Sequence, residues 1–171
     1  MLDNFFRINI FLLAIISTTF VLPIGVAVYY QEYEVVSSFL IPGIICIALA
    51  LIVLVLGKGK KITMTPRDAF IVVAAAWFFA SLLGALPLYI SSWVPSFTNA
   101  FFESVSGFTT TGATNLPDVE ILPKALNMWR CQMHWLGGMG IVALTVALMP
   151  LLGVGGFKLI KAETTGVEKG K

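Results

Sequence analysis

Long uncharged runs alternate with short polar segments along the chain. Residues 8–30, 35–56 and 69–90 contain no charged side chain, and a fourth run, residues 125–152, contains one arginine. Each run is long enough to cross the hydrocarbon core of a bilayer, which takes about 20 residues of helix. Residues 97–108 suit about three helical turns, which is too short to span. The pattern therefore predicts four membrane spans, with a short helix between the third and the fourth.

The polar stretch at residues 109–115 follows this short helix. β-Branching in Thr109, Thr110 and Thr111 favours extended backbone, and Gly112 permits positive φ. Irregular backbone at membrane depth is tolerated where it is buried in protein or lines a water-filled cavity, and rows of carbonyls can there replace the hydration shell of a cation. The stretch is therefore predicted to be a re-entrant ion filter with main-chain carbonyls as ligands. The negative end of the short helix would favour a cation beside it.

Prolines and caps refine the expected helix boundaries. Pro23 is expected to kink the first run, because proline removes a backbone N–H from the helix. Pro66 suits the first position of the helix that covers the third run, with Thr65 as its N-cap. Thr98 or Asn99 is expected to cap the short helix.

Composition indicates an integral membrane protein and excludes several kinds of site. The 171 residues are 58% hydrophobic and 12% charged, with a mean hydropathy of +0.92. A soluble domain carries about 25% charged residues. The two cysteines, Cys46 and Cys131, and the one histidine, His134, fall in apolar runs. Since a zinc site needs several such ligands close together, no zinc is expected, and neither is an organic cofactor or a nucleic-acid partner.

Basic residues predict the orientation in the membrane. Cytoplasmic loops are enriched in Lys and Arg, and nine of the eleven basic residues lie before the first run, between the second and third, or after the fourth. Both termini are therefore expected in the cytoplasm, with the short helix entering from outside. The nine are Arg7, Lys58, Lys60, Lys61, Arg67, Lys158, Lys161, Lys169 and Lys171, and the other two are Lys124 and Arg130.

The first apolar run has two interpretations. Small residues at 25–27 resemble a signal-peptide cleavage site. However, residues 8–30 exceed the apolar core of a signal peptide, which holds at most about 15 residues. A retained span is therefore the preferred interpretation, with a signal peptide as the alternative.

Two ordered sets of residues resemble the TrkH/KtrB potassium-uptake family of the Trk/Ktr/HKT superfamily. Residues 101–114, from Phe-Phe-Glu-Ser to Gly-Ala-Thr, are similar to the first pore loop of that family. Residues 129–140, with Trp-Leu-Gly-Gly-Met-Gly at their end, and residues 150–156 are similar to the segment that follows it there. The resemblance covers about residues 66–163. The first two spans resemble the extra N-terminal helix pair of the TrkH branch.

The resemblance implies a fold. It implies an all-α membrane protein in which two N-terminal transmembrane helices, residues 1–60, precede one helix–pore loop–helix (M1-P-M2) unit, residues 61–171. Within that unit it assigns about 69–90 to M1, 97–108 to the pore helix, 109–115 to the filter and 125–152 to M2.

The resemblance also implies a function and partners. It implies potassium uptake across the bacterial inner membrane through a channel-like pore, without enzymatic activity, with the transported K⁺ at Thr110, Thr111 and Gly112. Such proteins are homodimers in membrane lipid, with a cytosolic nucleotide-binding regulatory subunit of the TrkA/KtrA type. They carry four pore units, whereas this chain contains one. A single strand offers about two oxygens per ion, and a selective site needs four converging strands. The expectation is therefore a fragment of a longer chain that holds the remaining three pore units, and the alternative is a non-conducting fragment or assembly subunit.

Three residues are assigned to support of the filter, namely Glu103, Gly107 and Arg130. Glu103 either faces the ion vestibule or bonds locally to hold the pore helix, and the supporting role is preferred because an acid at membrane depth needs a partner or water. Arg130 is the expected partner.

Glycines at 137, 138 and 140 either form a gating hinge or allow close helix packing against the pore loop. Packing is the preferred interpretation, since small residues let membrane helices approach closely. An intramembrane enzyme that uses Ser104, Cys131 or His134 is the weaker functional alternative, because Cys131 and His134 form only a dyad.

Overall fold

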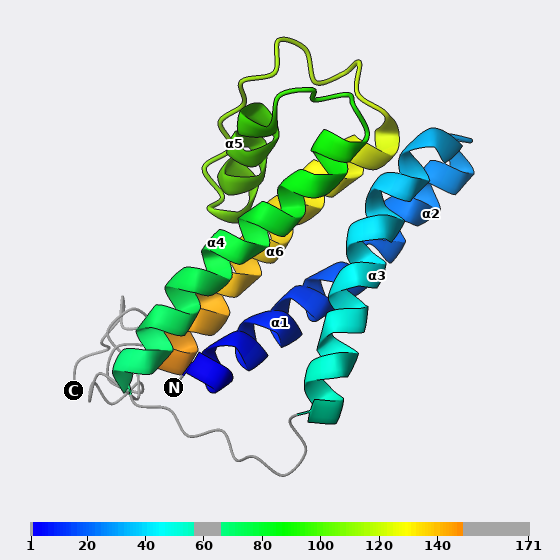
Figure 1. The fold of residues 1–171 in the computed structure, drawn as a ribbon. Coiled ribbons are helices and arrows are strands. Elements are labelled where there is room, and N and C mark those ends of the chain that lie inside the picture. Colours follow the sequence, from blue (N-terminus) through cyan, green and yellow to red (C-terminus); the bar gives the residue numbers. More distant parts are fainter. Residues whose placement is uncertain (1, 57–65, 149–171) are drawn as a thin grey trace, which may run out of the picture. The chain divides into compact units, whose positions relative to one another are not determined.

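The computed structural model describes residues 2–56 and 66–148, and within these ranges the chain is all helical (Figure 1). This confirms the expected all-α class. Six helices occur in the described ranges: α1 (Leu2–Thr18), α2 (Val21–Tyr29), α3 (Tyr33–Leu56), α4 (Pro66–Ile90), α5 (Phe97–Phe108) and α6 (Lys124–Leu148).

Three of the expected spans coincide with long apolar helices. In the described ranges, Phe5–Tyr29, Tyr33–Leu56 and Asp68–Ile90 are long and apolar enough to cross a membrane. The fourth expected span overlaps α6, and its last residues, 149–152, lie outside the described residues. Thr65 and the lysines that predict the orientation at 58–61 and 158–171 lie outside them as well.

Pro23 interrupts the first span, as expected, but the break lies four residues earlier. α1 ends at Thr18 and α2 begins at Val21. Because Pro23 has no N–H to donate, the carbonyl of Thr19 loses its helical partner. That carbonyl instead accepts from the side-chain Nε2 of Gln132 at 2.9 Å and from the Leu22 N–H at 3.2 Å. The broken helix is thereby bonded to α6.

Trp129 of α6 lies at the centre of the core. Its side chain is fully buried, and its ring centroid lies 4.8 Å from that of Phe20, 6.3 Å from that of Phe39 and 6.4 Å from that of Phe108, all edge to face. Its indole Nε1 donates to the Gly84 carbonyl at 2.9 Å. Aromatic edge-to-face pairs with a satisfied indole N–H are a favourable way to fill a core. We call α1 to α3, residues 2–56, the N-terminal hairpin. The Trp129 side chain thus joins this hairpin, α4, α5 and α6.

The short helix has the predicted bounds, Phe97–Phe108, but not the predicted cap. Ser96 holds the N-cap position with extended backbone, φ −90° and ψ 120°, and makes no side-chain capping bond. The expectation of Thr98 or Asn99 as cap was wrong, because both lie inside the first turn. Pro66 is the first residue of α4, as expected.

The chain divides into two compact units, Met1–Gly137 and Gly138–Lys171. The functional site described below lies wholly in the first unit. The expected division near residue 60, between an N-terminal helix pair and a pore unit, stays a prediction.

Candidate functional site

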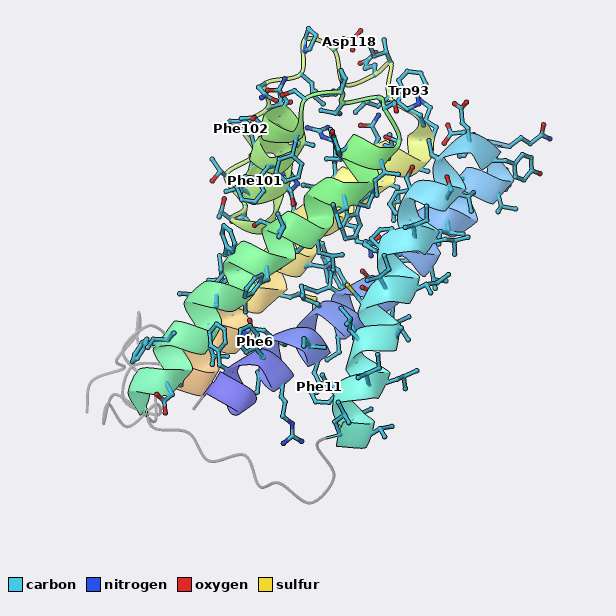
Figure 2. All side chains as sticks on the ribbon, in the orientation of Figure 1. Phe6, Phe11, Trp93, Phe101, Phe102 and Asp118 are labelled. Carbon is cyan, nitrogen blue, oxygen red and sulfur yellow. The ribbon has the colours of Figure 1, made fainter. Side chains whose placement is uncertain are left out.

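The chain reverses direction after α5. After Phe108 it turns and runs back beside α5, and Figure 1 shows this trace returning to the end of the molecule from which α5 began. Trp93, before α5, and Asp118, after it, are labelled at that same end in Figure 2, whereas Phe6 and Phe11 lie far from it. We call residues 109–115 the return segment. Its path reverses as a re-entrant loop requires, and its entry into a membrane stays a prediction.

Two backbone hydrogen bonds close the turn at the end of α5. Thr111 N–H donates to the Ser106 carbonyl at 3.0 Å and Thr110 N–H to the Gly107 carbonyl at 2.9 Å. This pairing places Thr110 at the position that usually holds a left-handed glycine, and its φ is +57°. A β-branched residue there is uncommon and is strained by about 1–3 kcal/mol.

The expected extended backbone is therefore wrong at two of the three threonines. Thr109 is still helical, with φ −82° and ψ 0°, and Thr110 is left-handed. The helix carbonyls at the end of α5 need donors, and satisfying them with the next N–H groups outweighs the β-branched preference for a strand.

Gly112 adopts positive φ, +75°, which confirms the conformational reason for a glycine here. A Cβ built on Gly112 would meet no atom within 4 Å. A larger residue is therefore disfavoured by backbone conformation alone and not by lack of space.

The carbonyls of residues 109–112 accept no hydrogen bond from any residue that the structure describes, and all four residues are exposed. The next carbonyl differs, because Ser106 Oγ donates to the Ala113 oxygen at 2.6 Å. The hydroxyls of Thr109 and Thr111 bond to each other at 2.8 Å. Four successive peptide oxygens thus remain available, and they precede a carbonyl bonded to the short helix.

A buried carboxylate holds the return segment against α5. Glu103 has a side chain that is 1% exposed, and its Oε1 accepts from Thr114 Oγ1 at 2.6 Å and from the Asn115 N–H at 2.9 Å. Its Oε2 accepts from Nε and Nη2 of Arg130, at 3.0 and 2.8 Å. Four donors thus satisfy a charge that would otherwise be costly to bury. The expected ion pair of Glu103 with Arg130 is present, and its geometry fits a bond between elements rather than an open vestibule.

Thr114 and Asn115 were not expected in this network. A signal was available, because a carboxylate can accept about four hydrogen bonds and a bidentate arginine fills only two of them. Thr114 is the first hydroxyl after the glycine of the return segment. The distance of eleven residues from Glu103 to Thr114 becomes a contact only because the chain reverses direction.

Glycines allow the helices to meet closely around the end of α5. A Cβ on Gly107 would lie 2.8 Å from Met133 Cβ, and one on Gly84 would lie 2.7 Å from a ring carbon of Phe108. A Cβ on Gly137 would overlap the Phe108 carbonyl. For Gly137 this geometry confirms close packing, here against the end of α5.

The structure does not join Ser104, Cys131 and His134, the residues of the alternative enzyme hypothesis, into a catalytic set. Ser104 Oγ donates to Met133 Sδ at 3.5 Å, and His134 Nδ1 lies 2.9 Å from the Arg130 carbonyl oxygen. Cys131 is exposed, and no hydrogen bond joins these three side chains in the described ranges. Over the same residues there is no cluster of His, Cys, Asp and Glu that could hold a metal ion.

Comparison with known proteins identifies the family. Residues 36–171 match the family model described as TrkH, cation transport protein. The chain belongs to the TrkH family. It is a transport-family protein, not an enzyme, and its helices belong in a membrane.

Individual relatives agree with this membership. The chain is 38% identical over 157 residues to the Trk system potassium uptake protein TrkG of Escherichia coli K12. The aligned region covers 91% of this chain and 32% of that protein. The chain is 39% identical over 162 residues to the Trk system potassium uptake protein TrkH of Salmonella typhimurium, covering 94% and 33%. The crystal structure of the potassium transporter TrkH from Vibrio parahaemolyticus matches with a TM-score of 0.81 and 36% identity, covering 91% of this chain and 33% of that one. The chain thus spans about a third of the length of the relatives it matches.

Proposed function

We propose that this TrkH-family chain supplies one filter segment of a potassium-uptake pore, with the carbonyls of Thr109, Thr110, Thr111 and Gly112 as ion ligands. The observation that carries the proposal is the row of peptide oxygens without hydrogen-bond donors in the described residues, on an exposed re-entrant segment. Relatives named as potassium uptake proteins support K⁺ as the transported ion. K⁺ is the substrate here and not a resident cofactor.

Three features suit the return segment to this role. α5 ends at Phe108, so its negative dipole end lies next to the carbonyls and favours a cation there. Gly112 and Thr110 have positive φ, which turns successive carbonyls in directions that a regular strand does not allow. Glu103 and Arg130 lie behind the segment and not among its free oxygens, which fits a supporting role, and Gly107 supports it through close contact with Met133.

One segment does not complete an ion site. A dehydrated K⁺ needs about the number of oxygens in its lost hydration shell, and one strand gives about two per site. We therefore assign the other ligands to three further pore units of a longer chain. By analogy with the family, the assembly is a homodimer in the bacterial inner membrane, with both termini and a TrkA/KtrA-type regulatory subunit in the cytoplasm. The division at about residue 60 into a helix pair and a pore unit belongs to the same proposal.

The test is ion selectivity in the intact transporter. Gly112→Ala forces a Cβ onto a left-handed backbone, which costs about 1–2 kcal/mol. We expect K⁺ preference over Na⁺ to fall about tenfold, since 1.4 kcal/mol is a factor of ten. The measurement is uptake of each ion in a bacterium that lacks its own potassium-uptake systems.

Gly25→Ala is the matched control. Gly25 lies in α2, a Cβ on it would also meet no atom within 4 Å, and its φ is not positive. The control should keep the selectivity of the unchanged protein. An unaltered K⁺/Na⁺ ratio in Gly112→Ala, with equal protein in the membrane, would count against the filter assignment.

A further inference from the structure

The turn between α2 and α3 reaches the start of α6. Glu32, in that turn, accepts the Lys124 N–H on Oε1 at 2.7 Å and the Ala125 N–H on Oε2 at 3.0 Å. Lys124 and Ala125 are the first two residues of α6, and N–H groups at a helix start have no partner within the helix. The carboxylate also meets the positive end of the helix dipole. The Glu32 side chain, 92 residues before Lys124 in the sequence, therefore caps the N-terminus of α6.

The loop before α6 offers no replacement for Glu32. Pro123 directly precedes the helix and has no polar side chain. Asn127 donates its Nδ2 back to the Val119 carbonyl at 2.7 Å, and Asp118 Oδ1 accepts the Glu120 N–H at 2.8 Å. Asp118 of the loop and Asn127 of α6 thus stabilise the loop and do not cap the start of α6. The start of α6 depends on the N-terminal hairpin.

Two more contacts join the hairpin to the same part of α6. Gln132 donates to the Thr19 carbonyl at the break between α1 and α2, and Trp129 packs edge to face on Phe20. Glu32 thus joins the hairpin to the first turn of α6, and the contacts of Trp129 and Gln132 join it again about two turns later. All of them lie within the unit that contains the return segment.

The first half of α6 carries the support of the return segment. Arg130 lies roughly 8 Å along the helix from the residues that Glu32 caps. Both Nε and Nη2 of Arg130 donate to Glu103, which in turn accepts from Thr114 and Asn115. Polar contacts therefore join the hairpin turn to the start of α6, and Arg130 to the end of the return segment through Glu103, with the first turns of α6 between the two sets.

We propose that Glu32 is a positioning residue for the filter, which sets the place of Arg130 and, through Glu103, the spacing of the filter carbonyls. The inference rests on the proposed function. It gives the N-terminal hairpin a part in ion selectivity, although none of its residues is among the proposed ion ligands. A purely structural role for Glu32 would instead change only the amount of folded transporter.

The test compares two isosteric substitutions in the intact transporter. Glu32→Gln keeps the shape but replaces one acceptor oxygen by an NH₂ group that faces an N–H donor. Glu34→Gln is the matched control, because Glu34 lies two residues on in the first turn of α3, is exposed and has no side-chain partner in the described ranges. We expect Glu32→Gln to lower the K⁺/Na⁺ uptake ratio about fivefold per molecule in the membrane, and Glu34→Gln to leave it unchanged. An unchanged ratio in Glu32→Gln would overturn the proposal.

A second variant separates positioning from helix capping. Pro123→Ser places a local N-cap before α6, so Glu32→Gln/Pro123→Ser stabilises the helix start without the contact that Glu32 makes. We expect this double variant to accumulate normally and still to show the lowered ratio. Restoration of the ratio by the local cap, or failure of both proteins to accumulate, would show that Glu32 acts only in folding and would overturn the proposal.

These experiments distinguish rejection of the Glu32 role from failure of the proposed function. If the unchanged intact protein takes up no K⁺, or Gly112→Ala does not alter the ratio, the filter assignment itself fails. If Gly112→Ala lowers the ratio and Glu32→Gln does not, the filter assignment stands and only the role of Glu32 is rejected.

Discussion

At the scale of single residues, the site depends on how a few polar groups are satisfied. Glu103 is almost fully buried and accepts four hydrogen bonds, two from Arg130 and one each from Thr114 and Asn115. Burying a carboxylate is tolerable only with such a set of donors. The consequence is that one side chain fixes α5, α6 and the return segment at once.

Substitution of Glu103 by Gln tests this network. The amide keeps one acceptor oxygen for four donors and loses the charge that pairs with Arg130. We expect the protein to lose roughly 3 kcal/mol of stability, the usual cost of breaking a buried ion pair. Thermal unfolding of the detergent-purified intact protein measures the loss.

Glu120→Gln is the control for this substitution. Glu120 lies in the exposed loop after the return segment, and no described residue bonds to its carboxylate. Its replacement should leave the unfolding curve in place. Equal curves for Glu103→Gln and Glu120→Gln would contradict the network as a source of stability.

At the scale of elements, the contact of α6 with the end of α5 decides how the return segment begins. Gly137 lies against the Phe108 carbonyl, and Gly107 lies against Met133. Small residues of this kind let helix backbones approach directly. The last carbonyl of α5 is therefore covered by α6 at the point where the return segment begins.

Gly137→Ala tests that contact. The added Cβ would overlap backbone atoms of Phe108, and a backbone cannot rotate away as a flexible side chain can. Overpacking of this kind costs typically about 1–3 kcal/mol, and we expect both lower thermal stability and slower K⁺ uptake. Gly25→Ala, with open space around it, should change neither. Wild-type behaviour of Gly137→Ala in both assays would be incompatible with the close contact.

At the scale of the whole molecule, the described ranges contain one return segment, and the chain spans about a third of the length of its relatives. Because one strand supplies about two oxygens per ion, we expect no transport by the 171 residues alone. Growth at low potassium of a bacterium that lacks potassium uptake measures this directly. The 171 residues should fail to support growth, and a form that includes the remaining pore units should succeed. Growth with the short chain would show that copies of it can assemble a pore, and would contradict the need for further units in the same chain.

Local sequence was sufficient to predict three helices of spanning length, the bounds of α5 and the glycine conformation at Gly112. Uncharged runs of spanning length leave few alternatives to helix in a membrane protein. Positive φ at residue 112 follows from the residue type in its setting. The pairing of Glu103 with Arg130 could also be predicted from the sequence, because a buried acid requires a partner.

The tertiary structure decided what local propensity could not. It made Thr110 left-handed against its β-branched preference, because the helix end had carbonyls to satisfy. It brought Thr114 and Asn115 to Glu103, and it placed Glu32 on the first turn of α6 across 92 residues. Sequence by itself determined which segments are helices and which segment returns. Which polar groups meet depends on chain reversal and helix packing, and these bring together residues whose separation along the chain gives no sign of their contact.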